Sequence, residues 1–148
     1  MIEEFTAPNP DYAAKTRQVF DDMTFLSDFM KVELAEVGPG RTVLQVPFRT
    51  DLSQQDGFFN GGVMATMADN GAGLAAYSLA PKGVEVLAAE FKINLLRPAN
   101  GELLIARSYA IKPGRMLCVC RSDLFILRDG GEKLCAAAQG TFAYLDTV

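Results

Sequence analysis

The stretch from Gly57 to Pro81 contains one charged residue, Asp69, among 25. A carboxylate in tight, apolar surroundings is a common form of a general base or nucleophile. On a helix, the neighbours of Asp69 on its own face are all small: Gly62, Ala65, Thr66, Ala72, Gly73 and Ala76. This face is therefore suited to close approach by a backbone, a second subunit or a ligand. The alternative is a buried acid whose oxygens are satisfied by a local hydrogen bond or a salt bridge.

Gly61 and Gly62 open the predicted helix, where free N–H groups and the positive end of the helix dipole meet. Glycine lets a ligand oxygen approach such amides, so the pair predicts an oxyanion hole or an anion site, although many such pairs are plain turns. Gly61 and Asp69 are eight residues apart, about 12 Å along a helix. To act on one carbonyl they must come from two subunits with antiparallel helices.

The length, residue composition and net charge of the chain exclude several kinds of catalytic and binding site. The chain has 148 residues, which predicts a single domain over 1–148, and it contains no histidine. Histidine triads, histidine bases and histidine metal sites are therefore excluded. The net charge of −4 disfavours a nucleic-acid partner.

The three cysteines, Cys118, Cys120 and Cys135, show no CxxC spacing, so we expect reduced core thiols. On a strand, Cys118 and Cys120 would share one face. The beginning of the chain has no signal-peptide pattern, and no run of about 20 apolar residues could span a bilayer. We expect a cytoplasmic protein.

The elements that must position these residues follow from periodicity and turn residues. An α+β plan is predicted, in which one curved antiparallel sheet packs on one main helix. The last four strands are expected to form a meander. The predicted elements are a helix over 10–31, a hairpin over 32–48, an ordered loop over 51–60, a helix over 61–80, and strands over 84–96, 102–111, 115–128 and 133–145.

Two motifs carry a family resemblance. The segments QQDGFFNGGVMATMADNGAGLAAY (54–77) and VLAAEFKINLLRPANGELLIARSYAIKPGR (86–115) resemble hotdog-fold acyl-CoA thioesterases of the PaaI-like type. That family pattern is His-Gly-Gly, six residues, then an acid, with a later Arg-Pro-Ala turn. The resemblance covers about residues 40–146. It implies a hotdog fold over 32–146, preceded here by an extra N-terminal helix.

The resemblance also implies roles for residues at matching positions. Asp69 takes the place of the catalytic carboxylate, and Gly61, followed by Gly62, that of the amide that polarises the thioester carbonyl. Gln54 matches a residue that positions water or the carboxylate. Asn60 stands where the family has histidine. The implied partners are an acyl-CoA substrate and a second copy of the chain, as a homodimer or a dimer of dimers, with no metal or redox cofactor.

Weaker candidates surround this set. Phe58 and Phe59 are expected either to line the acyl site or to be core aromatics. Arg97 and Arg115 are candidates for contacts with the phosphates of coenzyme A, or are ordinary solvated arginines. Ala88 stands where many relatives carry Ser or Thr, so one polar group is missing from the predicted pocket.

Three other functions compete with acyl-CoA hydrolysis. A non-catalytic binder of acyl-CoA or of a hydrophobic acid would explain Asn60 in place of histidine. A hotdog hydratase is disfavoured because those enzymes generally use a histidine beside the acid. A purely structural dimer module does not explain Asp69 in an otherwise uncharged segment.

Overall fold

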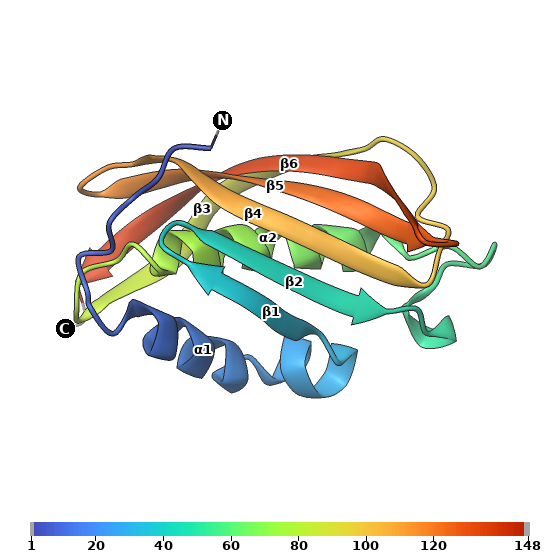
Figure 1. Ribbon diagram of the computed structural model, residues 1–148, viewed down its shortest axis with the longest axis horizontal. Helices are drawn as coiled ribbons and strands as arrows, with labels where there is room; N and C mark the ends of the chain where they lie inside the picture. Colours follow the sequence, from blue (N-terminus) through green and yellow to red (C-terminus); the bar gives the residue numbers. More distant parts are fainter. Residues whose placement is uncertain (1, 147–148) are drawn as a thin grey trace.

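One antiparallel sheet of six strands wraps around a central helix in the computed structural model, which describes residues 2–146 (Figure 1). The strand order is β1-β2-β4-β5-β6-β3. In chain order the elements are α1 (Tyr12–Asp22), the π-helical turn η1 (Phe25–Met30), β1 (Glu33–Gly38), β2 (Arg41–Pro47), the 3-10 turn η2 (Thr50–Leu52), α2 (Gly61–Tyr77), β3 (Val84–Leu95), β4 (Leu103–Pro113), β5 (Leu117–Arg128) and β6 (Gly131–Asp146).

The central helix α2 is embedded in the core by one of its faces. Met64, Met67, Leu74 and Ala75 are buried there, and Val63 is partly buried against the same core. The backbone of Gly71 approaches the sheet closely, because its carbonyl accepts a hydrogen bond from Thr42 Oγ1 at 2.8 Å. This is the hotdog arrangement that the sequence resemblance implies.

The predicted four-strand meander is wrong for its first strand. β4, β5 and β6 are consecutive neighbours, but β3 pairs with β6 and forms an edge of the sheet. The connection over 96–102 crosses the end of the sheet instead of making a tight turn. It is tied down by hydrogen bonds from the Leu96 and Arg97 N–H groups to the Cys135 carbonyl and from the Phe59 N–H to the Ala99 carbonyl.

The predicted N-terminal helix over 10–31 is not continuous. α1 ends at Asp22, and Met23 leaves the helical conformation with ψ 70°. The acids Asp21 and Asp22 lie at the negative end of the helix dipole, which disfavours its continuation. The π-helical turn η1 follows and ends at Met30, and the next residue, Lys31, has a φ of 59°.

The cysteines lie in the core, as expected. Cys118 and Cys120 are both buried on one face of β5, with their sulfur atoms 3.6 Å apart. Cys135 is buried and free.

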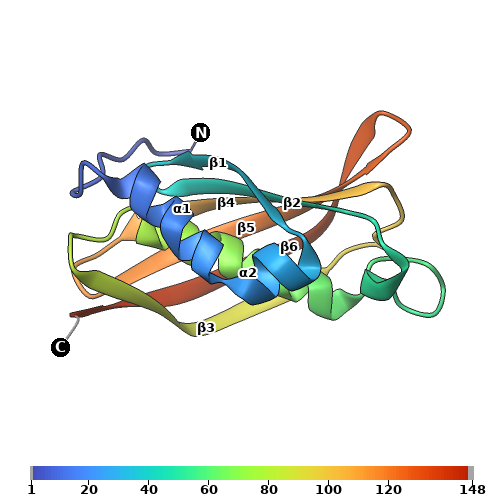
Figure 2. The ribbon, with the colours of Figure 1, turned by 90° about the horizontal axis from the view of Figure 1, so that it is seen from below.

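The two ends of the molecule carry different loops. The loop over 50–60, the 96–102 connection and the β5–β6 hairpin lie at one end, and the β4–β5 turn lies at the other (Figures 1 and 2). Across residues 2–146, no helix is long and apolar enough to cross a membrane. The same residues contain no group of three His, Cys, Asp or Glu side chains that could hold a metal ion.

Candidate functional site

Asp69 lies on α2 as a half-buried acid without a partner. Its Oδ1 atom is inaccessible and makes no hydrogen bond to any residue of 2–146. Burial raises the pKa of Asp69 above its ordinary value, because the charged form loses solvation without gaining a partner. The alternative of a locally satisfied acid is therefore not met among residues 2–146. A buried polar atom without a partner is unusual and points to a missing ligand, water or neighbour.

Two cavities meet at Asp69. The larger, of about 490 Å³, is lined by the acid together with Thr66, Met23, Phe25 and Phe91, among others. The Thr66 hydroxyl donates to the Gly62 carbonyl within the helix, at 2.9 Å. The smaller, of about 230 Å³, lies toward β3 and includes Ala88, which contributes only a methyl group. The acid thus faces a largely apolar space that is open to a ligand.

The sequence did not indicate most of the other residues that line the larger cavity: Met23, Thr24, Phe25, Leu26, Asn70 and Phe91. Met23 and Phe25 belong to the segment between α1 and β1, which lies across α2 in Figure 2. Phe91 faces α2 from β3. Their contact with Asp69 depends on long-range packing, so no local sequence pattern identifies them.

The N-terminus of α2 offers one free backbone donor beside the loop. Asn60 is the N-cap, and its Oδ1 accepts a hydrogen bond from the Gly62 N–H at 2.7 Å. The Gly62 amide is therefore occupied by the cap. The Gly61 N–H has no acceptor among the described residues, and the helix dipole adds positive potential there. A Cβ atom on Gly61 would lie 3.1 Å from Leu95 Cδ1, so the amide adjoins the end of β3.

Hydrogen bonds within the loop before α2 fix the position of its polar residue Gln54. The Gln54 carbonyl accepts from the Gly57 N–H at 3.1 Å, and its side-chain oxygen accepts from the Asp56 N–H. Gln54 therefore lies near the Gly61 end of the helix and not at Asp69. Phe59 is buried in the core, edge-on to Phe48, whereas Phe58 is partly exposed.

One chain does not bring these two groups of residues together. Asn60, Gly61 and Gln54 gather at the start of α2, and Asp69 lies about 12 Å further along the same helix. Beside both groups, Phe91 and Leu95 on the α2 side of β3 remain 39% and 56% exposed. The side of β3 next to both groups therefore carries exposed apolar side chains.

The two candidate phosphate contacts are also separated. Arg97 lies in the 96–102 connection, near the start of α2, and lines a third cavity. Arg115 lies in the β4–β5 turn, beside Leu79 and Pro81 at the other end of α2. Arg97 and Arg115 of one chain therefore cannot bind the same phosphate.

Known proteins are similar to this chain in sequence or in architecture. Residues 56–133 match the sequence profile of the Thioesterase superfamily. A thioesterase family protein from Silicibacter pomeroyi has 35% sequence identity and a TM-score of 0.89, over 92% of this chain and 99% of that chain. Acyl-coenzyme A thioesterase 13 from Homo sapiens is 25% identical over 113 residues, which is 73% of this chain and 80% of that protein.

A third likeness concerns the fold alone. The E. coli PaaI protein has a TM-score of 0.80 at 16% identity, over 93% of this chain and 96% of that chain. The profile match covers more than half of the chain and includes the Gly61 and Asp69 positions. The chain therefore belongs to the Thioesterase superfamily and has the hotdog fold, and this membership supports thioester hydrolysis as its general activity.

Proposed function

We propose that the protein hydrolyses acyl-CoA thioesters to a free acid and coenzyme A. The observation that carries this proposal is Asp69, a half-buried carboxylate with an unpartnered oxygen beside an apolar cavity. The human relative's name supports the substrate class. The cavity walls of Met23, Phe25 and Phe91 suit an apolar acyl group.

In the proposed reaction, the Asp69 carboxylate takes a proton from water while the water oxygen attacks the thioester carbonyl carbon. The negative charge that develops on the carbonyl oxygen is stabilised by the Gly61 N–H and the dipole of α2. Collapse of this intermediate breaks the C–S bond, and the leaving thiolate takes the proton from Asp69. Direct attack by the carboxylate, followed by hydrolysis of the mixed anhydride, is the nucleophilic version of this reaction.

The two halves of the site would come from two subunits. Antiparallel packing of two α2 helices would place Asp69 of one chain opposite Gly61 of its partner, twice per two-fold dimer. Gly62, Ala65 and Thr66 remain accessible and allow this approach, whereas Ala72 and Ala76 of the predicted small face are buried against the sheet. The exposed edge strand β3 offers a matching surface. Assembly into a dimer of dimers and a cytoplasmic location belong to the same proposal.

Asn60 would support the site in place of the family histidine. Its oxygen is committed to the Gly62 N–H, so its amide nitrogen remains as a donor. Gln54, at the same end of α2, would orient the water or the carboxylate.

The test is thiol release from short, medium, long and aryl acyl-CoA substrates by the wild type and by Asp69→Asn. We expect Asp69→Asn to lower kcat at least about a hundredfold, because general-base catalysis contributes that much or more. Asp11→Asn, which neutralises an exposed acid before α1 that makes no side-chain cap hydrogen bond, is the matched control and should keep full activity. Equal activity of Asp69→Asn and wild type would show that Asp69 is not the catalyst.

Isotope labelling separates the two versions of the mechanism. In a single turnover in oxygen-labelled water, a general base puts the label into the product acid. Nucleophilic attack forms a mixed anhydride, and water that then attacks the Asp69 carbonyl of this anhydride puts the label into the Asp69 carboxylate. Label in Asp69 therefore identifies the nucleophilic version.

Binding without turnover is the second candidate function. Asn60 at the histidine position is the observation that favours it. Tight binding of acyl-CoA with no thiol release from any substrate would support the binder and contradict the hydrolase.

A further inference from the structure

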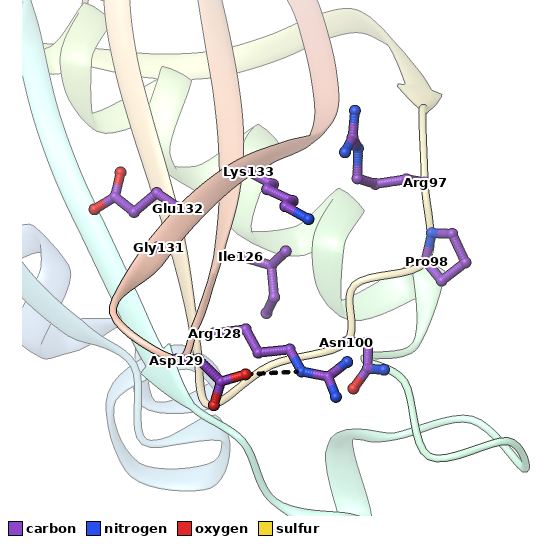
Figure 3. A pocket seen from close by; sticks show the side chains of 9 residues that line it. All are labelled: Arg97, Pro98, Asn100, Ile126, Arg128, Asp129, Gly131, Glu132 and Lys133. Carbon is purple, nitrogen blue, oxygen red and sulfur yellow. Dashed lines mark ion pairs between the residues drawn. The ribbon is translucent and has the colours of Figure 1, made fainter.

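Basic side chains surround a cavity of about 440 Å³ at the end of the sheet, beyond the start of α2 (Figure 3). Arg97 comes from the 96–102 connection, and Arg128 and Lys133 come from the two arms of the β5–β6 hairpin. We propose that this cavity binds the phosphates of coenzyme A, with Arg128 and Lys133 joining Arg97 as the binding cations. This inference rests on the proposed acyl-CoA activity.

The three cations have little compensating charge. No ion pair within residues 2–146 involves Arg97 or Lys133. Arg128 Nε lies 3.6 Å from Asp129 Oδ2, but both side chains are mostly exposed, at 58% and 86%. Such a pair is worth little and yields to a phosphate, which accepts two parallel hydrogen bonds from a guanidinium.

The other acid at the cavity, Glu132, is held on the opposite side of its strand. Neighbouring strand residues point to opposite faces, and Figure 3 shows the Glu132 carboxylate directed away from Lys133. Arg107 donates to both Glu132 oxygens, at 2.7 and 3.0 Å. This contact holds the pKa of Glu132 below its ordinary value, so the acid stays paired with Arg107. It does not cancel the charge of the cavity.

Hydrogen bonds and a tight turn fix the backbone segments that carry these three basic residues. Asp129 and Gly130 turn the hairpin with φ of 50° and 78°, the signs that a tight two-residue hairpin turn requires. The Asp129 N–H donates to Glu102 Oε1 at 3.2 Å, and the Arg97 N–H donates to the Cys135 carbonyl at 3.3 Å. The buried Ile126 forms an apolar floor between the basic groups.

A short segment connects this cavity to the proposed catalytic centre. Leu95 adjoins the free Gly61 amide, and Arg97, two residues later, lines the cavity. The Phe59 N–H to Ala99 carbonyl bond ties the same segment to the start of α2. A thioester carbonyl at Gly61 and phosphates at Arg97 would lie on the two sides of this segment, with the pantetheine arm along it.

The test compares an acyl-CoA with the acyl-pantetheine thioester of the same acid, which has no nucleotide and no phosphate. We expect Arg128→Ala and Lys133→Ala each to raise KM for the acyl-CoA about tenfold with kcat unchanged, because a charged hydrogen bond to phosphate is lost. KM for the acyl-pantetheine should not change. Lys82→Ala, an exposed cation beyond the other end of α2, is the matched control. Equal KM effects on both substrates, or none on either, would overturn the proposal.

Binding by Asp69→Asn separates this proposal from the proposed activity. Calorimetric titration of this variant with coenzyme A measures phosphate recognition without turnover. We expect additional Arg128→Ala or Lys133→Ala to weaken binding about tenfold, with a reduced dependence on salt. If no thioester is hydrolysed but these substitutions still weaken coenzyme A binding, the phosphate site stands and the catalytic proposal fails. Unchanged binding of coenzyme A overturns the phosphate site.

Discussion

At the scale of the single residue, Asp69 has a property that a purely structural acid would not keep. Its inaccessible oxygen has no partner among the described residues, and burial raises its pKa. A carboxylate in this environment costs stability and gains basicity, which are the properties a catalytic base needs. Asn60 is different, because its oxygen does structural work in capping α2.

Because the buried Asp69 carboxylate destabilises the folded protein, its removal should raise the stability by an amount that depends on pH. Because its folded pKa is raised, the native state binds this proton more tightly than the unfolded state, and stability falls as pH rises from about 3.8 through the folded pKa. Asp69→Asn carries no such charge. We therefore expect a higher Tm for Asp69→Asn than for wild type at pH 7, measured by thermal unfolding, with the difference shrinking in acid. A difference that is independent of pH would contradict this origin.

At the scale of the element, α2 combines a core face with glycines that set its distance from the sheet. A Cβ atom on Gly71 would lie 2.5 Å from Ser108 Oγ, which is buried and hydrogen-bonded to Ser122 Oγ at 2.8 Å. At Gly73 the nearest atom would be on the Phe142 ring, at 3.4 Å, an ordinary contact. A side chain at position 71 would therefore clash with the sheet, whereas position 73 has room for a methyl group.

This difference predicts opposite effects of alanine at the two positions. Gly71→Ala should destabilise the protein by about 1–2 kcal/mol, since overpacking outweighs the gain in helix propensity. Gly73→Ala should stabilise it by about 0.5–1 kcal/mol through propensity alone. Urea unfolding of both variants measures these changes. If both variants gained stability, the close approach at Gly71 would not constrain the packing of α2.

At the scale of the whole molecule, the edge strand β3 is the least covered part of the sheet. Phe91 and Leu95 are exposed on its α2 side, whereas Leu87, which precedes the register shift between Ala88 and Glu90, lies on the opposite face. Long apolar edges of this kind are normally paired or covered. The surface adjoins both Asp69 and Gly61, so a partner that covered it would also complete the proposed site.

We expect the protein to be a dimer through this surface, and Phe91→Asp to shift it to monomer in analytical ultracentrifugation. A buried, unpaired charge at the interface would oppose association. Met116→Asp changes a residue that is 67% exposed in the β4–β5 turn, and it should leave the assembly unchanged. A dimer that survives Phe91→Asp would place the interface elsewhere.

Local chemistry in the sequence was enough to predict much of this protein. Periodicity and the positions of glycine and proline predicted the helix that begins at Gly61, the strands and most turns. The thioesterase relationship follows from two spaced motifs.

Tertiary structure alone decided three features. It paired β3 with β6, and it brought Met23 and Phe25 against the Asp69 cavity. It also gathered Arg97, Arg128 and Lys133 at one end of the sheet. These outcomes depend on which distant segments bury surface and share hydrogen bonds, and residue spacing along the chain does not encode that choice locally.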